Sequence, residues 1–196
     1  FPDLAIESSD PIWYGRLVER MVHDINIVKA RFGAERIILE NAPWDQTPGY
    51  AVPRLGIEPS VIRSVIEETG CGFLLDLAHA RMAALYLEMD AKVYIEQLPV
   101  KYLRELHVCG VQYDETIHAW RDHFAMTDDD WRLVEWAFRR IDAGVWRAPA
   151  IVALEYGGVT PRLEWRSESN VLLREIPRLQ ALIKSVTTMT TERQLV

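Results

Sequence analysis

Four short, continuously apolar segments, separated by stretches with helical periodicity, constrain the fold of this chain more than any other feature. The segments are 36–40 (RIILE), 72–76 (GFLLD), 105–109 (ELHVC) and 150–155 (AIVALE), and a weaker fifth is 3–7 (DLAIE). Continuous rather than alternating apolar residues are typical of strands buried on both faces of a parallel sheet. The sequence therefore predicts four strong strands and one weaker strand.

The stretches between these segments carry apolar residues at helical spacing. The expected helices are 11–32, 59–69, 80–98 with possible breaks, 128–141, and a last one that begins at Ser167 or Ser169 and runs to 182. Strands that alternate with helices in this way predict βα units and a parallel sheet. A full (β/α)₈ barrel takes about 250 residues. A chain of 196 residues with four or five βα units therefore predicts an α/β fold that is part of a TIM-type barrel.

A doubly wound open sheet is the alternative fold, although no glycine-rich phosphate-binding motif follows any of the strands. We expect one domain over residues 1–186 and a polar tail over residues 187–196. A barrel that lacks strands leaves apolar edges uncovered, so a homodimer, or completion by another segment, is expected.

Composition and charge argue against several classes of protein. The residues are 49% hydrophobic and 26% charged, as in a globular domain with one core. The net charge of −7 argues against a nucleic-acid partner, and no apolar run approaches the roughly 20 residues of a membrane span. Residues 1–11 lack the features of a signal peptide, and the two cysteines fit neither a disulfide framework nor a zinc spacing, so we expect a cytoplasmic protein. Because the first residue is Phe1, the sequence leaves open whether others precede it.

The strong strands share a titratable residue at or near their carboxyl ends. Three of them end on a carboxylate, namely Glu40, Asp76 and Glu155, and the fourth carries His107. In parallel α/β barrels the strand ends meet at one rim, where active sites are built. Buried carboxylates are costly without a partner, and a metal ion supplies the missing positive charge most directly. The sequence therefore predicts a metal site.

The segments after these strands add further ligand types. His79 follows Asp76, and Asp122 and His123 follow the strand that carries His107. Mixed histidine and carboxylate ligands suit iron, manganese or zinc better than calcium. Each residue alone fits a simpler interpretation, such as a salt bridge, a helix cap or a core histidine. Their coincidence on four strands favours a metal or catalytic cluster.

These residues resemble the motifs of the multinuclear non-heme iron-dependent oxidases. The matching stretches are Ile38–Asn41, Leu74–Asp76, Glu105–His107 with Gly110 after it, Asp122–His123 and Leu154–Glu155. The resemblance implies a xylose-isomerase-like TIM barrel that binds two or three irons. It also implies oxidation of cysteine or other residues in a ribosomal precursor peptide, often with a separate partner protein that recognises the leader.

Carried over by this resemblance, the iron ligands would be Glu40, Asp76, His107, His123 and Glu155. The pattern also departs from the family. Ala78 and His79 stand where the family usually has two asparagines, and Asp122–His123 lacks the spacer of the usual Asp-x-His. The segment before residue 12 has no counterpart of the family's early histidines, and Tyr156–Gly157 replaces an expected acidic residue.

Two other functions stay open at this point. A divalent-metal sugar isomerase or epimerase, or a hydrolase, could use the same glutamate, aspartate and histidine set. A non-catalytic barrel scaffold is the third interpretation. Which of His79, His118 and His123 are ligands is also open, and Cys109 is expected to face away from His107. The loop 41–59, with Trp44 and Tyr50, lines a peptide groove or simply packs over the barrel mouth.

Overall fold

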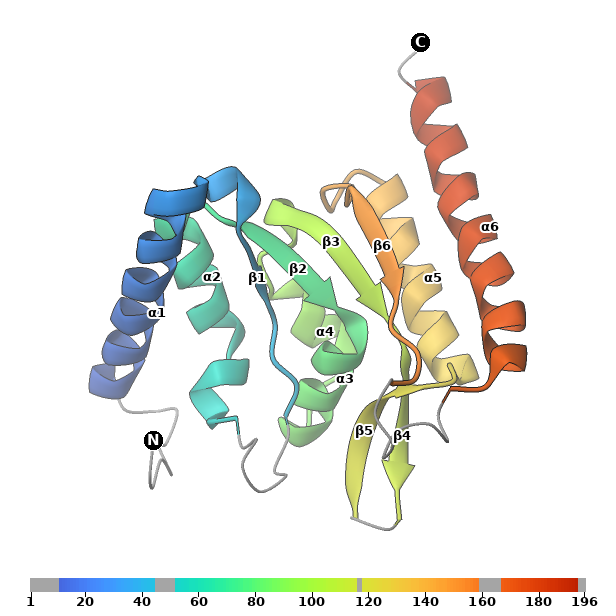
Figure 1. The fold of residues 1–196 in the computed structure, drawn as a ribbon, viewed down its shortest axis with the longest axis horizontal. Coiled ribbons are helices and arrows are strands. Elements are labelled where there is room, and N and C mark those ends of the chain that lie inside the picture. Colours follow the sequence, from blue (N-terminus) through green and yellow to red (C-terminus); the bar gives the residue numbers. More distant parts are fainter. Residues whose placement is uncertain (1–10, 45–51, 116–117, 159–166, 194–196) are drawn as a thin grey trace.

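The computed structural model describes residues 11–44, 52–115, 118–158 and 167–193, with side chains up to residue 185 (Figure 1). The weak strand expected at 3–7 and Tyr50 lie outside the described residues.

Four parallel strands form the central sheet, in the order β1–β2–β3–β6 (Figure 1). They are β1 (Ile38–Glu40), β2 (Gly72–Asp76), β3 (Leu103–Val108) and β6 (Ile151–Leu154). The four strong strands predicted from the apolar segments are therefore confirmed, each displaced by at most a few residues. The outer edges of β1 and β6 pair with no strand in the described part of the chain.

The helices follow the strands, as the sequence predicts. The elements are α1 (Pro11–Phe32), η1 (Ala34–Arg36), η2 (Arg54–Ile57), α2 (Pro59–Thr69), α3 (Leu77–Tyr86), α4 (Ala91–Glu96), η3 (Val100–Tyr102), α5 (Asp128–Asp142) and α6 (Ser169–Arg193). Helix α2 begins at Pro59 and ends at Thr69, and the next residue, Gly70, has a φ of 70° that suits a residue without a Cβ. Helix α5 begins with a capping box between Thr127 and Asp130.

The sheet has one face that packs against helices and one face that carries the polar residues. Phe73, Leu75, Leu106 and Val108 are fully buried in the main core, together with residues of α2, α3, α4 and α5. Side chains alternate along a strand, so Asp76 and His107 point to the opposite face. Helix α1 packs on α2 at one end of this layer, and α6 packs on α5 at the other (Figure 1).

Three features differ from the expectations. A two-stranded antiparallel hairpin, β4 (Gly110–Asp114) and β5 (Ala119–Phe124), occupies a segment expected to be a loop. The segment 80–98, expected to be helical with possible breaks, holds two helices, and the first of them, α3, begins earlier than expected, at Leu77. Helix α6 continues to Arg193, into the segment expected to be a polar tail.

The parallel α/β fold is confirmed, and its four βα units are consistent with part of a TIM-type barrel. None of the described helices combines the length and apolar composition needed to cross a membrane.

Candidate metal centre

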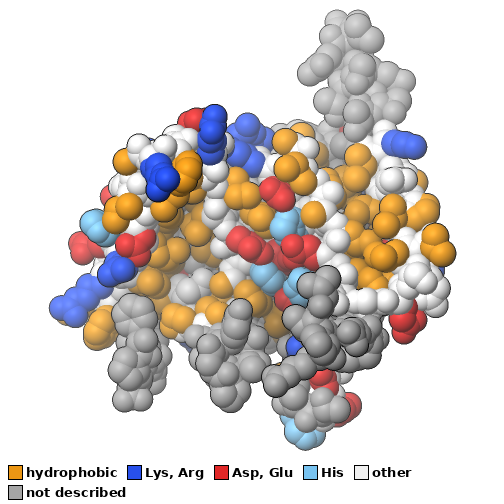
Figure 2. All heavy atoms as spheres, viewed as in Figure 1, with side chains coloured by type: hydrophobic (Ala, Val, Ile, Leu, Met, Phe, Trp, Pro, Cys, Tyr) orange, Lys and Arg blue, Asp and Glu red, His pale blue; other side chains and the backbone are white. Residues whose placement is uncertain are grey.

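Titratable residues from all four strands gather at the carboxyl ends of the sheet. Figure 2 shows carboxylates and histidines together at the centre of this face, surrounded by apolar side chains. Two groups of residues each bring three ligand-type atoms within 4.8 Å of one another. The first group is Glu40, Asp76 and His79, and the second is Asp76, His107 and Glu155. We call these the His79 group and the His107 group.

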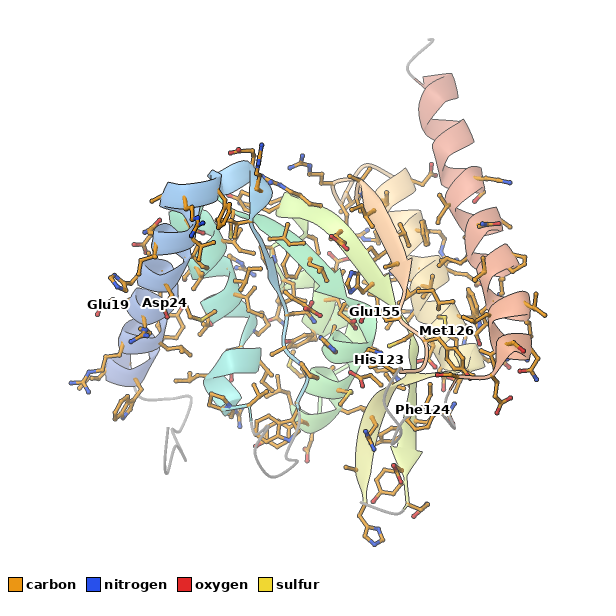
Figure 3. The ribbon with its side chains drawn as sticks, viewed as in Figure 1. Glu19, Asp24, His123, Phe124, Met126 and Glu155 are labelled. Atoms are coloured by element: carbon orange, nitrogen blue, oxygen red, sulfur yellow. The ribbon has the colours of Figure 1, made fainter. Side chains whose placement is uncertain are left out.

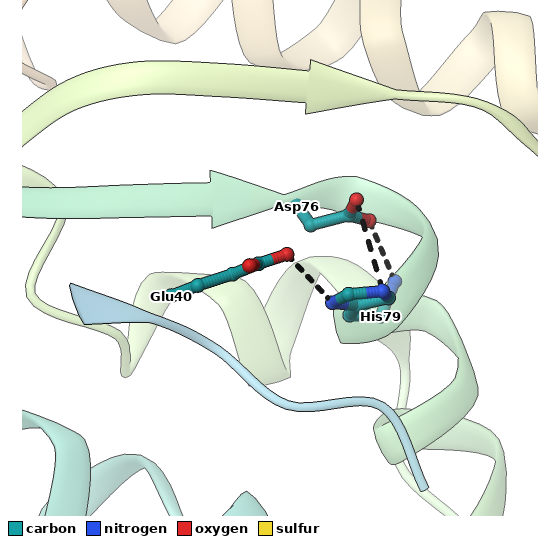
Figure 4. Close-up of side chains that lie close together, drawn as sticks. All are labelled: Glu40, Asp76 and His79. Atoms are coloured by element: carbon teal, nitrogen blue, oxygen red, sulfur yellow. Dashed lines mark hydrogen bonds and ion pairs between the residues drawn. The ribbon is translucent and has the colours of Figure 1, made fainter. Parts of the chain in front are cut away.

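The His79 group joins the end of β1 to the first turn of α3. Asp76 caps α3, because its Oδ1 accepts the backbone N–H of His79 at 2.8 Å. The ring of His79 lies between carboxylates: its Nδ1 is 3.1 Å from Glu40 Oε1, and its Nε2 is 3.9 Å from Asp76 Oδ2 (Figure 4). The helix cap therefore fixes where this histidine stands.

Asn41 connects the ends of β1 and β2. Its side chain donates to the carbonyl of Asp76 at 3.0 Å and accepts the N–H of Asp76 at 2.9 Å. Its own carbonyl lies 2.9 Å from His79 Nδ1. Asn41 is fully buried, so these bonds hold Asp76 and His79 together without competition from water.

The His107 group joins β2, β3 and the residue after β6. Asp76 and His107 are paired in register on neighbouring strands. His107 Nδ1 lies 3.0 Å from Glu155 Oε1, while its Nε2 lies 2.8 Å from Oε1 of Glu105. The ring is thus held between a carboxylate of its own strand and one from β6.

Asp76 belongs to both groups and is fully buried. Its Oδ2 has no hydrogen-bond partner among the described residues, and the same is true of His107 Nδ1. Burial raises the pKa of Asp76 to about 6, although His79 next to it favours the charged form. A buried carboxylate oxygen and a buried histidine nitrogen that both lack a hydrogen bond in the described part of the chain, with the Glu155 carboxylate 3.0 Å from that nitrogen, form an arrangement that a cation would complete.

The pKa values of the two rings reflect the same excess of negative charge. Burial disfavours protonation of His79, but the carboxylates of Asp122 and Glu40 outweigh it and raise the pKa to about 11. Glu155 raises the pKa of His107 to about 9, with a smaller contribution from Glu105. Without a metal, the protonated rings are the cations among these carboxylates.

The hairpin brings Asp122 and His123 to the same rim. Asp122 Oδ2 lies 3.2 Å from His79 Nε2, which adds a third carboxylate to the surroundings of that ring. His123 is 3.8 Å from Asp122, lies outside both groups, and has a left-handed backbone with φ of 60°. The backbone N–H of Gly157 donates to the carbonyl of His123 at 2.9 Å, so the base of the hairpin meets the segment after β6, where Figure 3 labels His123 and Glu155. His118 is exposed at the turn of the hairpin.

Comparison with known proteins adds an independent observation. The family model described as "RiPP precursor modification enzyme MbnB/TglH/ChrH" matches residues 11–166, which include every residue of both groups. The chain belongs to this family. It is the family of multinuclear non-heme iron-dependent oxidases that the sequence motifs indicated, so that prediction is confirmed. RiPPs are ribosomally made peptides that are modified after synthesis.

The curated relatives of this MbnB/TglH/ChrH family member are distant. A UPF0276 protein of Paraburkholderia phytofirmans is 30% identical over 115 residues, which are 49% of this chain and 38% of that protein. A UPF0276 protein of Rhizobium meliloti is 26% identical over 64% of this chain and 38% of its own length. One from Acaryochloris marina is 25% identical over 86% of this chain and 52% of its own length. The chain thus spans about two fifths to one half of these relatives.

Two residues of this family member were placed wrongly or overlooked in the sequence. Cys109 was expected to face away from His107, but its Sγ accepts the N–H of His123, and burial together with the charge of Asp76 raises its pKa. Residues two apart on an extended segment share a face, which contradicts that expectation. Glu105 was not predicted as a site residue, although the same spacing from His107 was a usable signal.

Proposed function

We propose that this chain carries the metal centre of an iron-dependent oxidase that modifies residues, often cysteine, of a ribosomal precursor peptide. The observation that supports it most is Asp76, a fully buried carboxylate shared by two ligand groups, with one oxygen that has no hydrogen-bond partner among the described residues. Family membership supports a peptide substrate. A leader-recognition partner protein is part of the same proposal.

The donor set fits iron. Histidine nitrogens and carboxylate oxygens are the ligands of non-heme iron sites, and manganese or zinc would use the same atoms. We propose that the residues of the His79 group and the His107 group would hold the metal, with Asp76 contributing to both groups. Asp122 and His123 extend the set from the hairpin. Iron at this position would supply one-electron chemistry with dioxygen.

The chain's own residues have distinct tasks in this proposal. Asn41 and the cap of α3 hold Asp76 and His79 in place before any metal arrives, which lowers the cost of ordering the site. Glu155 and Glu40 are partly exposed, with side-chain accessibilities of 31% and 42%, so they face the side from which a peptide would approach.

Elemental analysis of anaerobically purified protein tests the proposal. Wild-type protein is expected to hold two or three irons per chain, and Glu155→Ala is expected to lose the metal of the His107 group. Glu135→Ala is the matched control, because Glu135 of α5 pairs with Arg178 of α6, belongs to neither group, and its replacement removes the same charge as Glu155→Ala does.

The alternatives predict different metal contents. One zinc or manganese per chain would favour a sugar isomerase, an epimerase or a hydrolase. Folded wild-type protein that holds no metal would refute the proposal and leave a scaffold. Metal bound equally by wild type and Glu155→Ala would remove Glu155 from the site. A mass shift in a precursor peptide, seen with the iron-loaded protein and absent in Glu155→Ala, would identify the reaction.

A further inference from the structure

Each histidine of the two groups is fixed from behind by a hydrogen-bond acceptor. Glu105 Oε1 lies 2.8 Å from His107 Nε2, and the carbonyl of Asn41 lies 2.9 Å from His79 Nδ1. A carbonyl oxygen can only accept, and a carboxylate accepts whenever it is ionised, so each of these nitrogens carries a hydrogen. The acceptors attach to different nitrogens in the two rings.

The opposite nitrogen of each ring also lies among carboxylates of the site, and in His79 the Glu40 carboxylate lies 3.1 Å from Nδ1, the nitrogen that the Asn41 carbonyl already engages. His107 Nδ1 is buried, has no hydrogen-bond partner among the described residues, and lies 3.0 Å from Glu155. His79 Nε2 lies 3.2 Å from Asp122 and 3.9 Å from Asp76. A neutral imidazole with a hydrogen on the rear nitrogen offers its lone pair to a metal from the front nitrogen.

From this geometry we infer that His107 binds metal through Nδ1 and His79 through Nε2, and that Glu105 is the residue that positions His107. The inference rests on the proposed function, because it assigns the ligand atoms of the same centre. Glu105 touches only the rear of the ring in this arrangement, so it is a positioning residue and not a ligand. Asn41 has the same task for His79, through its backbone.

Glu105 and the Asn41 carbonyl engage different ring nitrogens, which lets two histidines from different elements both lie near Asp76. His107 extends from the middle of the sheet, whereas His79 stands in the first turn of α3. Nδ1 lies closer to the backbone than Nε2 does, so ligation through Nδ1 keeps the metal of the His107 group near β3. Ligation through Nε2 lets His79 reach from the helix toward Asp76.

The test uses zinc, a diamagnetic probe, and the full chain labelled with ¹⁵N-histidine. Long-range ¹H–¹⁵N correlation spectra distinguish protonated from metal-bound ring nitrogens, and His79→Gln and His107→Gln assign the signals among five histidines. We expect a zinc-bound Nδ1 and a protonated Nε2 in His107, and the reverse in His79.

Variants of Glu105 separate positioning from general stability. Glu105→Ala removes the rear acceptor and is expected to weaken zinc binding roughly 10–100-fold, with both nitrogens of His107 competing for the metal. Glu105→Gln keeps an oxygen that accepts the Nε2 hydrogen and should restore the wild-type spectrum and most of the affinity. Glu67→Ala, which removes an equal charge from an ion pair with Lys101, should bind zinc as wild type does.

The outcomes distinguish this inference from the proposed function. Zinc on Nε2 of His107, or an unchanged His107 spectrum and affinity in Glu105→Ala, would overturn the inference while leaving a metal centre. A wild-type protein that binds neither zinc nor iron would overturn the proposed function and the inference with it. Zinc on Nδ1 of His107, shifted by Glu105→Ala and restored by Glu105→Gln, would support both.

Discussion

Two buried carboxylates of this protein look alike by burial and differ in what surrounds them. Asp76 is 0% exposed and Glu175, in α6, is 1% exposed. Each has one oxygen without a hydrogen-bond partner among the described residues, and burial raises the pKa of both. Asp76 faces two histidines and two glutamates, whereas Glu175 accepts the N–H of Met126 and lies next to Arg174.

The difference shows that burial of a carboxylate is not enough to indicate a metal site. Glu175 ties α6 to the segment before α5, and its single backbone bond with a nearby arginine accounts for its position. Asp76 has ligand-type atoms on both sides, from three other strands and a helix. Several ligand-type side chains around a carboxylate oxygen that lacks a hydrogen bond to any described residue, as at Asp76, therefore indicate a metal site better than burial does.

Asp76→Asn should have the largest effect, the loss of metal from both groups. The amide oxygen can still accept the N–H of His79, so the cap of α3 and the fold should survive. Elemental analysis together with circular dichroism measures both effects. Glu175→Gln is the matched control, since it also converts a buried carboxylate to an amide, and it should keep the full metal content. A variant Asp76→Asn that retains half of the metal would show that the two groups do not share this residue.

Asn41→Ala tests the two hydrogen bonds that the Asn41 side chain makes with the backbone of Asp76. It leaves the N–H and the carbonyl of Asp76 without their buried partners, and each unsatisfied group costs about 1–3 kcal/mol. We expect the free energy of unfolding to fall by about 2–4 kcal/mol in urea denaturation. The control Asn170→Ala, at an exposed position of α6, should change it by less than about 0.5 kcal/mol. Equal stability of the two variants would contradict this role for Asn41.

Gly110→Ala tests the end of the hairpin strand β5, which lies between Asp122, beside His79, and Met126, which donates to Glu175. A Cβ at Gly110 would collide with the carbonyls of Phe124 and Ala125, directly before the residue that donates to Glu175. Since backbone must move, we expect a loss of about 1–3 kcal/mol and weaker metal binding through displacement of Asp122. Gly15→Ala, where nothing lies within 4 Å, is the control and should be neutral or slightly stabilising. Unchanged metal affinity in Gly110→Ala would show that Asp122 does not contribute.

Much of the fold and all five residues of the two groups could be predicted from the sequence, for a physical reason. Parallel strands end at the same rim, so Glu40, Asp76, His107 and Glu155 come together whatever the details of register. Helix starts were visible at Pro59 and Thr127, whose local chemistry suffices.

The remaining features depend on contacts between distant segments. The hairpin has no two-residue glycine turn to signal it, and Asp122 reaches His79 only because the hairpin folds back over the strand ends. Which nitrogen of each histidine faces the metal position depends on Glu105 and on a backbone carbonyl, which no residue spacing specifies.

Glu175→Gln should give the smallest effect, a change in how stability depends on pH. Burial raises the pKa of Glu175 in the folded protein above its ordinary value of 4.5, against the backbone bond from Met126 and the charge of Arg174, while Asp130 acts in the same direction as burial. The protonated form therefore favours folding. Its contribution is complete below about pH 4 and is lost as the pH rises through the folded-state pKa. The stability of Glu175→Gln relative to wild type should rise between pH 4 and pH 8 in urea titrations. A pH-independent difference would mean that Glu175 titrates alike in the folded and unfolded chains, and its burial would then cost the fold nothing that depends on charge.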